Sequence, residues 1–266
     1  MQRAFFVHNV DFFPRVQCAD LGSQGNFGTP YSCWLCHWAR HYHLFAMETT
    51  AANLPELLYI QDPLCGWCYG MSPVIQQVQA GFAGRIDVSV LCGGMVTGND
   101  AGPIADSWDY IRHALTEVET VTGVQFGEAF QRLGDEGSYL YNSEPPCRAI
   151  TAFRQLTQDP ARIVAFAHAV QLALFRDGQD LNNPSSYTAL LAPFGVDVVE
   201  FQHHWALPET VRAAQQEFAA VARIGVQGFP TAVLRIGEQG YVLARGYQPY
   251  EQLRQGLEQL LREQAQ

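Results

Sequence analysis

Three segments between residues 57 and 90 constrain the fold of the chain more than any other part of the sequence. Residues 57–60 are apolar at every position, which is typical of a strand covered on both faces of a sheet. Residues 69–82 follow with apolar positions three and four apart, as in a helix that buries one side. Residues 86–90 then alternate apolar and polar side chains. This order predicts two parallel strands joined by a right-handed helical crossover.

The remaining sequence predicts a block of helices and then a return to sheet. Between residues 97 and 207 no strand pattern occurs, and candidate helices cover residues 104–122, 125–133, 146–158, 160–176, 185–192 and 198–205. An amphipathic helix follows Pro208, residues 232–236 and 241–244 form a hairpin pattern, and a last helix covers residues 250–263. We therefore predict an α/β fold in which residues 97–207 interrupt a core formed by 47–96 and 208–266.

Residues 1–46 differ in character from the rest of the chain. They contain Trp, Cys and His in irregular order and show neither a helical nor a strand period. We interpret them as an irregular N-terminal extension, either disordered or upstream of a natural start at Met47. The alternative is a metal- or haem-binding segment, because Cys33, Cys36 and His37 match the C-x-x-C-H pattern of covalent haem attachment.

Charge and cysteine content exclude several classes of protein. The formal net charge of -10 on 266 residues would repel nucleic acid and anionic lipid, so we expect neither a nucleic-acid nor a membrane partner. Seven cysteines, an odd number spread thinly, do not form a secreted disulfide framework. The sequence shows no signal-peptide or membrane-spanning pattern. We therefore expect a cytoplasmic protein whose thiols stay reduced.

Cys65 and Cys68 form a C-x-x-C pair at the junction of the first predicted strand and its helix. The first N–H groups of a helix lack intrahelical partners and lie at the positive end of its dipole, which would stabilise a thiolate at Cys65. Cys68, one turn further on, could attack a mixed disulfide at Cys65. This arrangement predicts a redox pair with Cys65 as nucleophile and Cys68 as resolving thiol. Structural packing or half a zinc site is the alternative.

A second motif, formed by Gly228, Phe229, Pro230 and Thr231, precedes the strand predicted at 232–236. Proline cannot donate a hydrogen bond to a sheet, so it is found at strand starts and in tight turns. The bond before it can be cis at modest cost. Alone, this pattern indicates only a loop.

The chain from residue 57 to its end resembles the DsbA-type branch of the thioredoxin superfamily, and most closely its cytoplasmic FrnE-like subgroup of predicted protein-disulfide isomerases. The resemblance rests on DPLCGWCYGMSP at 62–73, the glycines at 93 and 94, SEPPCRA at 143–149 and GFPT at 228–231. It implies a thioredoxin fold of order β-α-β … α-β-β-α with an all-helical domain inserted at 97–207. It also implies a cis bond before Pro230.

The same resemblance implies roles for individual residues. Residues 228–231 would flank the dithiol and bind an extended substrate peptide by strand addition, and Trp67 would lie exposed at the rim and contact substrate. Relatives carry a buried carboxylate that relays protons to the resolving cysteine, but the sequence does not indicate which residue this is. Cys147, at a predicted helix start, is a candidate auxiliary thiol, whereas Cys92 ends a buried strand and is expected in the core.

These observations lead to the hypothesis of a thiol-disulfide oxidoreductase, a reductase or isomerase acting on disulfide-containing proteins or small thiols. We expect no metal and no tightly bound cofactor besides the redox-active pair, with glutathione as the candidate electron donor. The alternative is a glutathione-dependent kappa-type transferase or a hydroxychromene-carboxylate-type isomerase on the same fold. Those enzymes usually have serine at the position of Cys65 and lack the second cysteine, so Cys68 argues against them.

Overall fold

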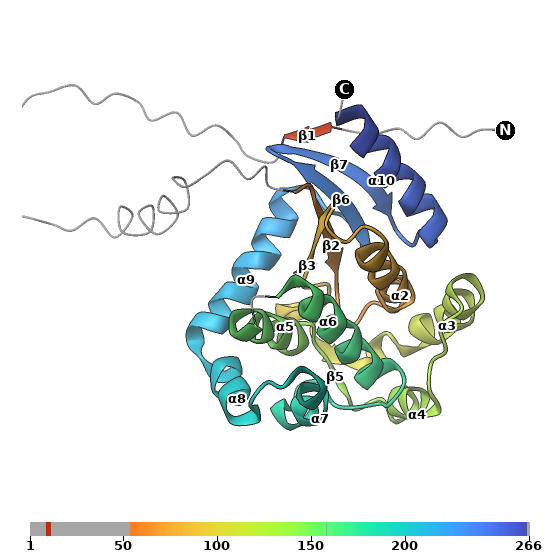
Figure 1. The fold of residues 1–266 in the computed structure, drawn as a ribbon. Coiled ribbons are helices and arrows are strands. Elements are labelled where there is room, and N and C mark those ends of the chain that lie inside the picture. The colour runs from red at the N-terminus through yellow and green to blue at the C-terminus, as the bar shows by residue number, and fades with distance from the viewer. Residues whose placement is uncertain (1–8, 12–53, 158, 265–266) are drawn as a thin grey trace, which may run out of the picture. The chain divides into compact units, whose positions relative to one another are not determined.

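A mixed five-stranded sheet forms the centre of the computed structural model, which describes residues 9–11, 54–157 and 159–264 (Figure 1). The strands are β1 (Asn9–Asp11), β2 (Glu56–Gln61), β3 (Asp87–Cys92), β6 (Thr231–Ile236) and β7 (Gln239–Arg245), in the order β1-β7-β6-β2-β3. β2 and β3 run parallel, as the sequence predicts, and the other neighbours pair antiparallel. Apart from β1, the predicted extension 1–46 lies outside the described residues.

Helices surround this sheet. They are α2 (Gly66–Gly81), α3 (Trp108–Thr122), α4 (Glu128–Glu136), α5 (Glu144–Thr157), α6 (Pro160–Phe175), α7 (Thr188–Leu191), α8 (Val198–Ala206), α9 (Pro208–Arg223) and α10 (Tyr250–Gln264). Most lie within a few residues of their predicted bounds. α4 starts three residues later than predicted, because the Gly127 N–H donates to Phe175 O at 2.8 Å and holds Gly127 outside the helix. The helix predicted at 185–192 is only a single α-helical turn between two 3-10 turns.

Both faces of the sheet are covered, which explains the uninterrupted apolar run in β2. Successive side chains of a strand point to opposite faces. Leu57 and Tyr59 accordingly belong to the main core, whereas Leu58 and Ile60 join a smaller cluster with Val221 of α9. Figure 1 shows α9 on one side of the sheet and α2 and α10 on the other.

The segment 97–207 contains a small sheet, so the prediction that it is free of strands and all-helical is wrong. β4 (Gly102–Pro103) pairs antiparallel with β5 (Leu140–Tyr141). Two residues per strand are too few to show alternation, and Gly and Pro are depleted in strands, so the sequence carries no signal for this pairing. The segment also shares the main core with the sheet: Phe166 and Val170 of α6 are in the same buried cluster as Val88 and Val90 of β3.

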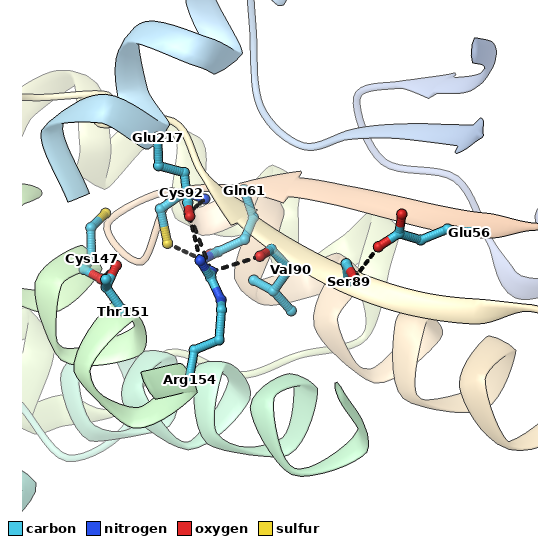
Figure 2. A network of polar contacts seen from close by, with 9 residues as sticks. All are labelled: Glu56, Gln61, Ser89, Val90, Cys92, Cys147, Thr151, Arg154 and Glu217. Carbon is cyan, nitrogen blue, oxygen red and sulfur yellow. Dashed lines mark hydrogen bonds and ion pairs between the residues drawn. The ribbon is translucent and has the colours of Figure 1, made fainter. Parts of the chain in front are cut away.

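An ion pair between Arg154 of α5 and Glu217 of α9 lies against β3, one of the two edge strands of the sheet (Figure 2). One row of backbone groups on an edge strand has no strand partner. Here Arg154 Nη2 donates to Val90 O at 2.8 Å, and Glu217 Oε1 accepts from the Cys92 N–H at 2.5 Å. Two side chains of opposite charge therefore satisfy backbone groups that a sixth strand would otherwise bind.

In the part of the chain that the structure describes, no helix is long and apolar enough to cross a membrane.

Removing the charge of Arg154 should destabilise the fold markedly, because Glu217, whose side chain is 11% exposed, would lose its partner. We expect Arg154→Met to lower the free energy of unfolding by about 3 kcal/mol, the usual cost of leaving a largely buried charge unpaired. Arg132→Met is the matched control, since its pair with Glu128 is exposed and should change stability by less than about 0.5 kcal/mol. Urea unfolding measures both changes, and equal losses would contradict the role of the pair.

Candidate active site

Cys65 occupies the N-cap of α2. Its backbone is extended, with φ -87° and ψ 114°, and its Sγ accepts a hydrogen bond from the Cys68 N–H at 3.3 Å. The Sγ thereby satisfies one of the N–H groups in the first turn that have no intrahelical partner. Cys65 therefore lies at the positive end of the α2 dipole, beside N–H groups of the first turn.

The loop before β6 meets this thiol. The Phe229–Pro230 peptide bond is cis, as the resemblance implies, and Cys65 Sγ donates to Phe229 O across 3.7 Å. β2 and β6 are neighbours in the sheet and pair as far as Ile60 and Thr231. The sheet therefore brings together two motifs that are 164 residues apart in the sequence.

The four residues of the second motif differ in their access to solvent. Gly228 is exposed and Phe229 is half-buried, whereas Pro230 and Thr231 are buried. The Thr231 hydroxyl donates to Gly228 O at 2.8 Å and so closes the turn before β6. Substrate binding by this loop stays a prediction, and only Gly228 and Phe229 offer appreciable surface for it.

Trp67 is half-buried, whereas the resemblance implies an exposed ring. Its indole packs against Tyr247, with ring centroids 6.5 Å apart. The neighbouring Gly246 N–H donates to Pro230 O at 2.8 Å, which ties the loop after β7 to the cis-proline loop. Trp67 and Tyr247 therefore form an aromatic pair beside the dithiol, joined to the same loop that faces Cys65.

Cys68 is completely buried in the first turn of α2, whereas Cys65 is 6% exposed. Burial raises the pKa of the Cys68 thiol well above its ordinary value, and the neighbouring Cys65 raises it further. Cys68 is therefore protonated at neutral pH and has no surface through which a substrate could reach it. The two thiols differ in the way that a nucleophile and a resolving thiol require.

Asp62 is a buried carboxylate just before the dithiol. Its Oδ1 accepts from the Leu64 N–H and the Ser143 hydroxyl, both at 2.9 Å. Its Oδ2 accepts from the Met95 N–H at 2.6 Å and from Cys147 Sγ at 3.9 Å. Burial raises the pKa of Asp62, and these hydrogen bonds oppose the shift without cancelling it. Asp62 thus connects the active-site loop to the segment after β3 and to the start of α5.

Two buried tyrosines hold the backbone around the dithiol. The Tyr59 hydroxyl donates to Cys68 O at 2.9 Å, and the Tyr141 hydroxyl donates to Leu64 O at 2.5 Å. Burial raises the pKa of both tyrosines well above the ordinary value, so they remain hydrogen-bond donors. They fix carbonyl groups on either side of Cys65.

Cys92 and Cys147 are buried thiols (Figure 2). Cys92 Sγ accepts from Gln61 Nε2 at 3.5 Å, and its burial agrees with the predicted core position. Cys147 lies at the start of α5, as the sequence predicts, and its Sγ donates to Asp62 Oδ2 at 3.9 Å. A substrate cannot touch Cys147 in this conformation.

The metal or haem site considered at Cys33, Cys36 and His37 lies outside the described residues. Within residues 54–157 and 159–264, no three His, Cys, Asp or Glu side chains gather as metal ligands would.

Sequence patterns did not identify Asp62, Ser143, Tyr59 or Tyr141 as site residues. Asp62 and Pro63 indicate only the end of a strand, although an acidic residue leading from a buried strand into a C-x-x-C pair is a signal for a buried carboxylate. Tyr141 and Ser143 are more than 70 positions after Cys65 in the sequence, and no spacing rule relates them to it.

A dithiol at the start of the helix after a central strand, facing a cis-proline loop before the adjacent strand, defines a thioredoxin-fold protein of the thiol-disulfide oxidoreductase class. The family model described as a DSBA-like thioredoxin domain matches residues 59–258. The chain belongs to this family.

Solved structures of similar proteins agree with this assignment. A candidate protein disulfide isomerase from Nitrosomonas europaea is 28% identical, with a TM-score of 0.71 over 79% of this chain and 99% of that chain. The cytosolic disulfide reductase DsbM from Pseudomonas aeruginosa is 26% identical, with a TM-score of 0.63 over 78% of this chain and 98% of DsbM. A structure of DsbM with glutathione gives 27% identity and a TM-score of 0.61 over 78% of this chain and 99% of that chain. No curated protein sequence matches the chain.

The raised pKa of Asp62 predicts a specific pH dependence of stability. Because the folded state binds this proton more tightly than the unfolded chain, protonation of Asp62 stabilises the fold at low pH, and the contribution is lost as pH rises through the raised pKa. The unfolding free energy of the wild type minus that of Asp62→Asn should be largest below about pH 4 and should decrease at higher pH.

Urea unfolding of both proteins at a series of pH values measures this difference. Asp106→Asn, at an exposed aspartate, controls for the loss of one negative charge. A difference between the wild type and Asp62→Asn that does not change with pH would contradict a raised pKa.

Proposed function

We propose that the chain is a disulfide reductase or isomerase that works through the Cys65-Gly-Trp-Cys68 dithiol. The observation that carries the proposal is the position of Cys65 Sγ, which caps α2 and lies 3.7 Å from the carbonyl that precedes the cis-proline. Similarity to a disulfide reductase and to a candidate disulfide isomerase supports the same chemistry. The presence of Cys68 favours it over the kappa-type transferase or isomerase alternative.

The proposed reaction has two thiol-disulfide exchanges. The Cys65 thiolate attacks one sulfur of a substrate disulfide R–S–S–R′, which forms Cys65–S–S–R and releases R′–S⁻. The Cys68 thiolate then attacks Cys65 Sγ, which forms the Cys65–Cys68 disulfide and releases R–S⁻. The substrate gains two electrons and the protein loses two. Isomerisation follows if a second substrate thiol, instead of Cys68, attacks the mixed disulfide.

The second exchange requires a proton acceptor, because buried Cys68 is a protonated thiol at neutral pH. We propose that Asp62 fills this role. It is a buried carboxylate next to the dithiol, and its raised pKa makes it a stronger base than an exposed aspartate.

Substrate binding is proposed at the surface that Gly228, Phe229 and Trp67 offer around Cys65. An extended peptide could add its backbone to that of the cis-proline loop, with side chains against the aromatic pair of Trp67 and Tyr247. The substrate would be a disulfide in a protein or a small thiol compound.

Glutathione is the proposed electron donor. One glutathione thiolate attacks Cys65 Sγ and releases the Cys68 thiolate, and a second attacks the sulfur of the bound glutathione, which gives glutathione disulfide and the reduced dithiol. The crystallisation of DsbM with glutathione supports this choice. A reducing compartment such as the cytosol, in which DsbM is described, would suit net reduction.

Trapping variants test the roles of the two cysteines. With a peptide that contains one disulfide, Cys68→Ser should accumulate a mixed disulfide at Cys65, because no thiol is left to resolve it. Cys65→Ser should form none, since Cys68 is completely buried. Non-reducing electrophoresis and mass spectrometry identify the adduct and its position. Equal trapping by the two variants would refute the proposed function.

The auxiliary role considered for Cys147 can be tested separately. Cys147→Ser keeps a hydrogen-bond donor toward Asp62 and removes the thiol. Because Cys147 is buried, we expect turnover with the disulfide peptide to stay within about twofold of the wild type. A loss of more than about tenfold with unchanged thermal stability would show that the thiol takes part in the reaction.

A further inference from the structure

The segment directly after β3 packs against the cis-proline loop more closely than any side chain would allow. A Cβ atom added to Gly93 would lie 1.9 Å from Cζ and 2.0 Å from Cε1 of Phe229. Gly93 has no positive φ, so its backbone conformation does not require glycine. The ring of Phe229 occupies the space that a Cβ would need, and this contact is what requires glycine there.

Hydrogen bonds hold the segment after β3, which contains Gly93, in place. The Gly93 N–H donates to Gln61 O at 2.9 Å, and the Met95 N–H donates to Asp62 Oδ2 at 2.6 Å. Val96 is bound to Ser143 twice, through its N–H at 3.0 Å and its carbonyl at 2.7 Å. Since these bonds fix the segment to the end of β2 and to the start of α5, an atom added at Gly93 would displace the Phe229 ring.

The ring and the carbonyl of Phe229 belong to one residue, which lies between exposed Gly228 and buried Pro230. The carbonyl accepts the hydrogen bond from Cys65 Sγ, so a shift of the ring alters the environment of the nucleophilic sulfur. We propose that Gly93 is a positioning residue: its missing side chain lets the Phe229 ring pack on the anchored segment and thereby holds Phe229 O at the Cys65 thiol. The proposal rests on the proposed function in taking Cys65 as the nucleophile.

The direction of the effect follows from the hydrogen bond. A carbonyl oxygen accepts from the S–H form of Cys65, whereas it repels the thiolate, so this contact favours the protonated thiol. Moving Phe229 O away should let the thiolate form at lower pH. It should also disturb the backbone to which a substrate peptide would bind.

The test uses Gly93→Ala in the full chain, with Cys68→Ser present so that Cys65 remains a free thiol. The rate of alkylation of Cys65 by iodoacetamide is measured against pH, with mass spectrometry of the Cys65 peptide. We expect the midpoint of the profile to move to lower pH by about half a unit, the size expected for losing one weak hydrogen bond.

A double-mutant cycle identifies the cause of the shift. Phe229→Leu removes Cζ and both Cε atoms, the atoms nearest to a Cβ at Gly93. If the ring transmits the effect, Gly93→Ala should shift the midpoint in the Phe229 background but not in the Leu background. Phe229→Tyr, which adds an oxygen at Cζ toward Gly93, should move the midpoint in the same direction as Gly93→Ala and gives a second test if Gly93→Ala does not fold.

Gly102→Ala is the matched control. Gly102 is also half-buried and has no positive φ, but its added Cβ would meet only the movable Asp106 carboxylate, at 3.1 Å. With Gly102→Ala added to Cys68→Ser, the midpoint of the Cys65 alkylation profile should equal that of Cys68→Ser alone. An unchanged midpoint in folded Gly93→Ala, or a shift that persists with Phe229→Leu, would overturn the proposal.

Reduction of the disulfide peptide by the wild type, assayed in parallel, separates this proposal from the function. No turnover by the wild type would reject the proposed function, while the alkylation profile would still measure the coupling between Gly93 and Cys65.

Discussion

The carboxylate of Asp62 is the interaction on which the geometry of the site depends. It accepts hydrogen bonds from two backbone N–H groups, one hydroxyl and one thiol, which lie in the loop before Cys65, in the segment after β3 and at the start of α5. Burying an acid is unfavourable, as its raised pKa shows, and four donors offset that cost. Asp62 is thus one carboxylate to which the loop of Cys65, the segment after β3 and the start of α5 are all bound.

The helical segment 97–207 therefore takes part in building the site. Ser143 and Cys147 bind Asp62, Tyr141 binds the carbonyl next to Cys65, and Arg154 binds the edge of β3. Its apolar side chains also share the main core with the sheet. A substitution within this segment can thus alter the surroundings of the dithiol through packing and hydrogen bonds. The two cysteines and the cis-proline themselves lie outside the segment, on the parts of the chain that form the main sheet.

The sequence predicted the parts of the structure that have local signatures. The parallel strands, the helix between them and the position of Cys65 follow from apolar spacing and one motif, and the cis bond at Pro230 follows from family resemblance. Features that depend on distant partners were missed. β4 and β5 are too short to show a pattern, Trp67 is half-buried because of Tyr247, and Asp62 contacts Ser143, which lies 81 positions further along the chain.

The ion pair at β3 also determines how the sheet can associate. An edge strand with free backbone groups can template the addition of another chain, and repeated addition leads to edge-to-edge polymers. With Val90 O and the Cys92 N–H already bound by Arg154 and Glu217, an incoming strand would have to displace two charges before it could form its first ladder bonds here. The ion pair thus opposes strand addition at Val90 and Cys92, beside a site that is proposed to bind extended peptides.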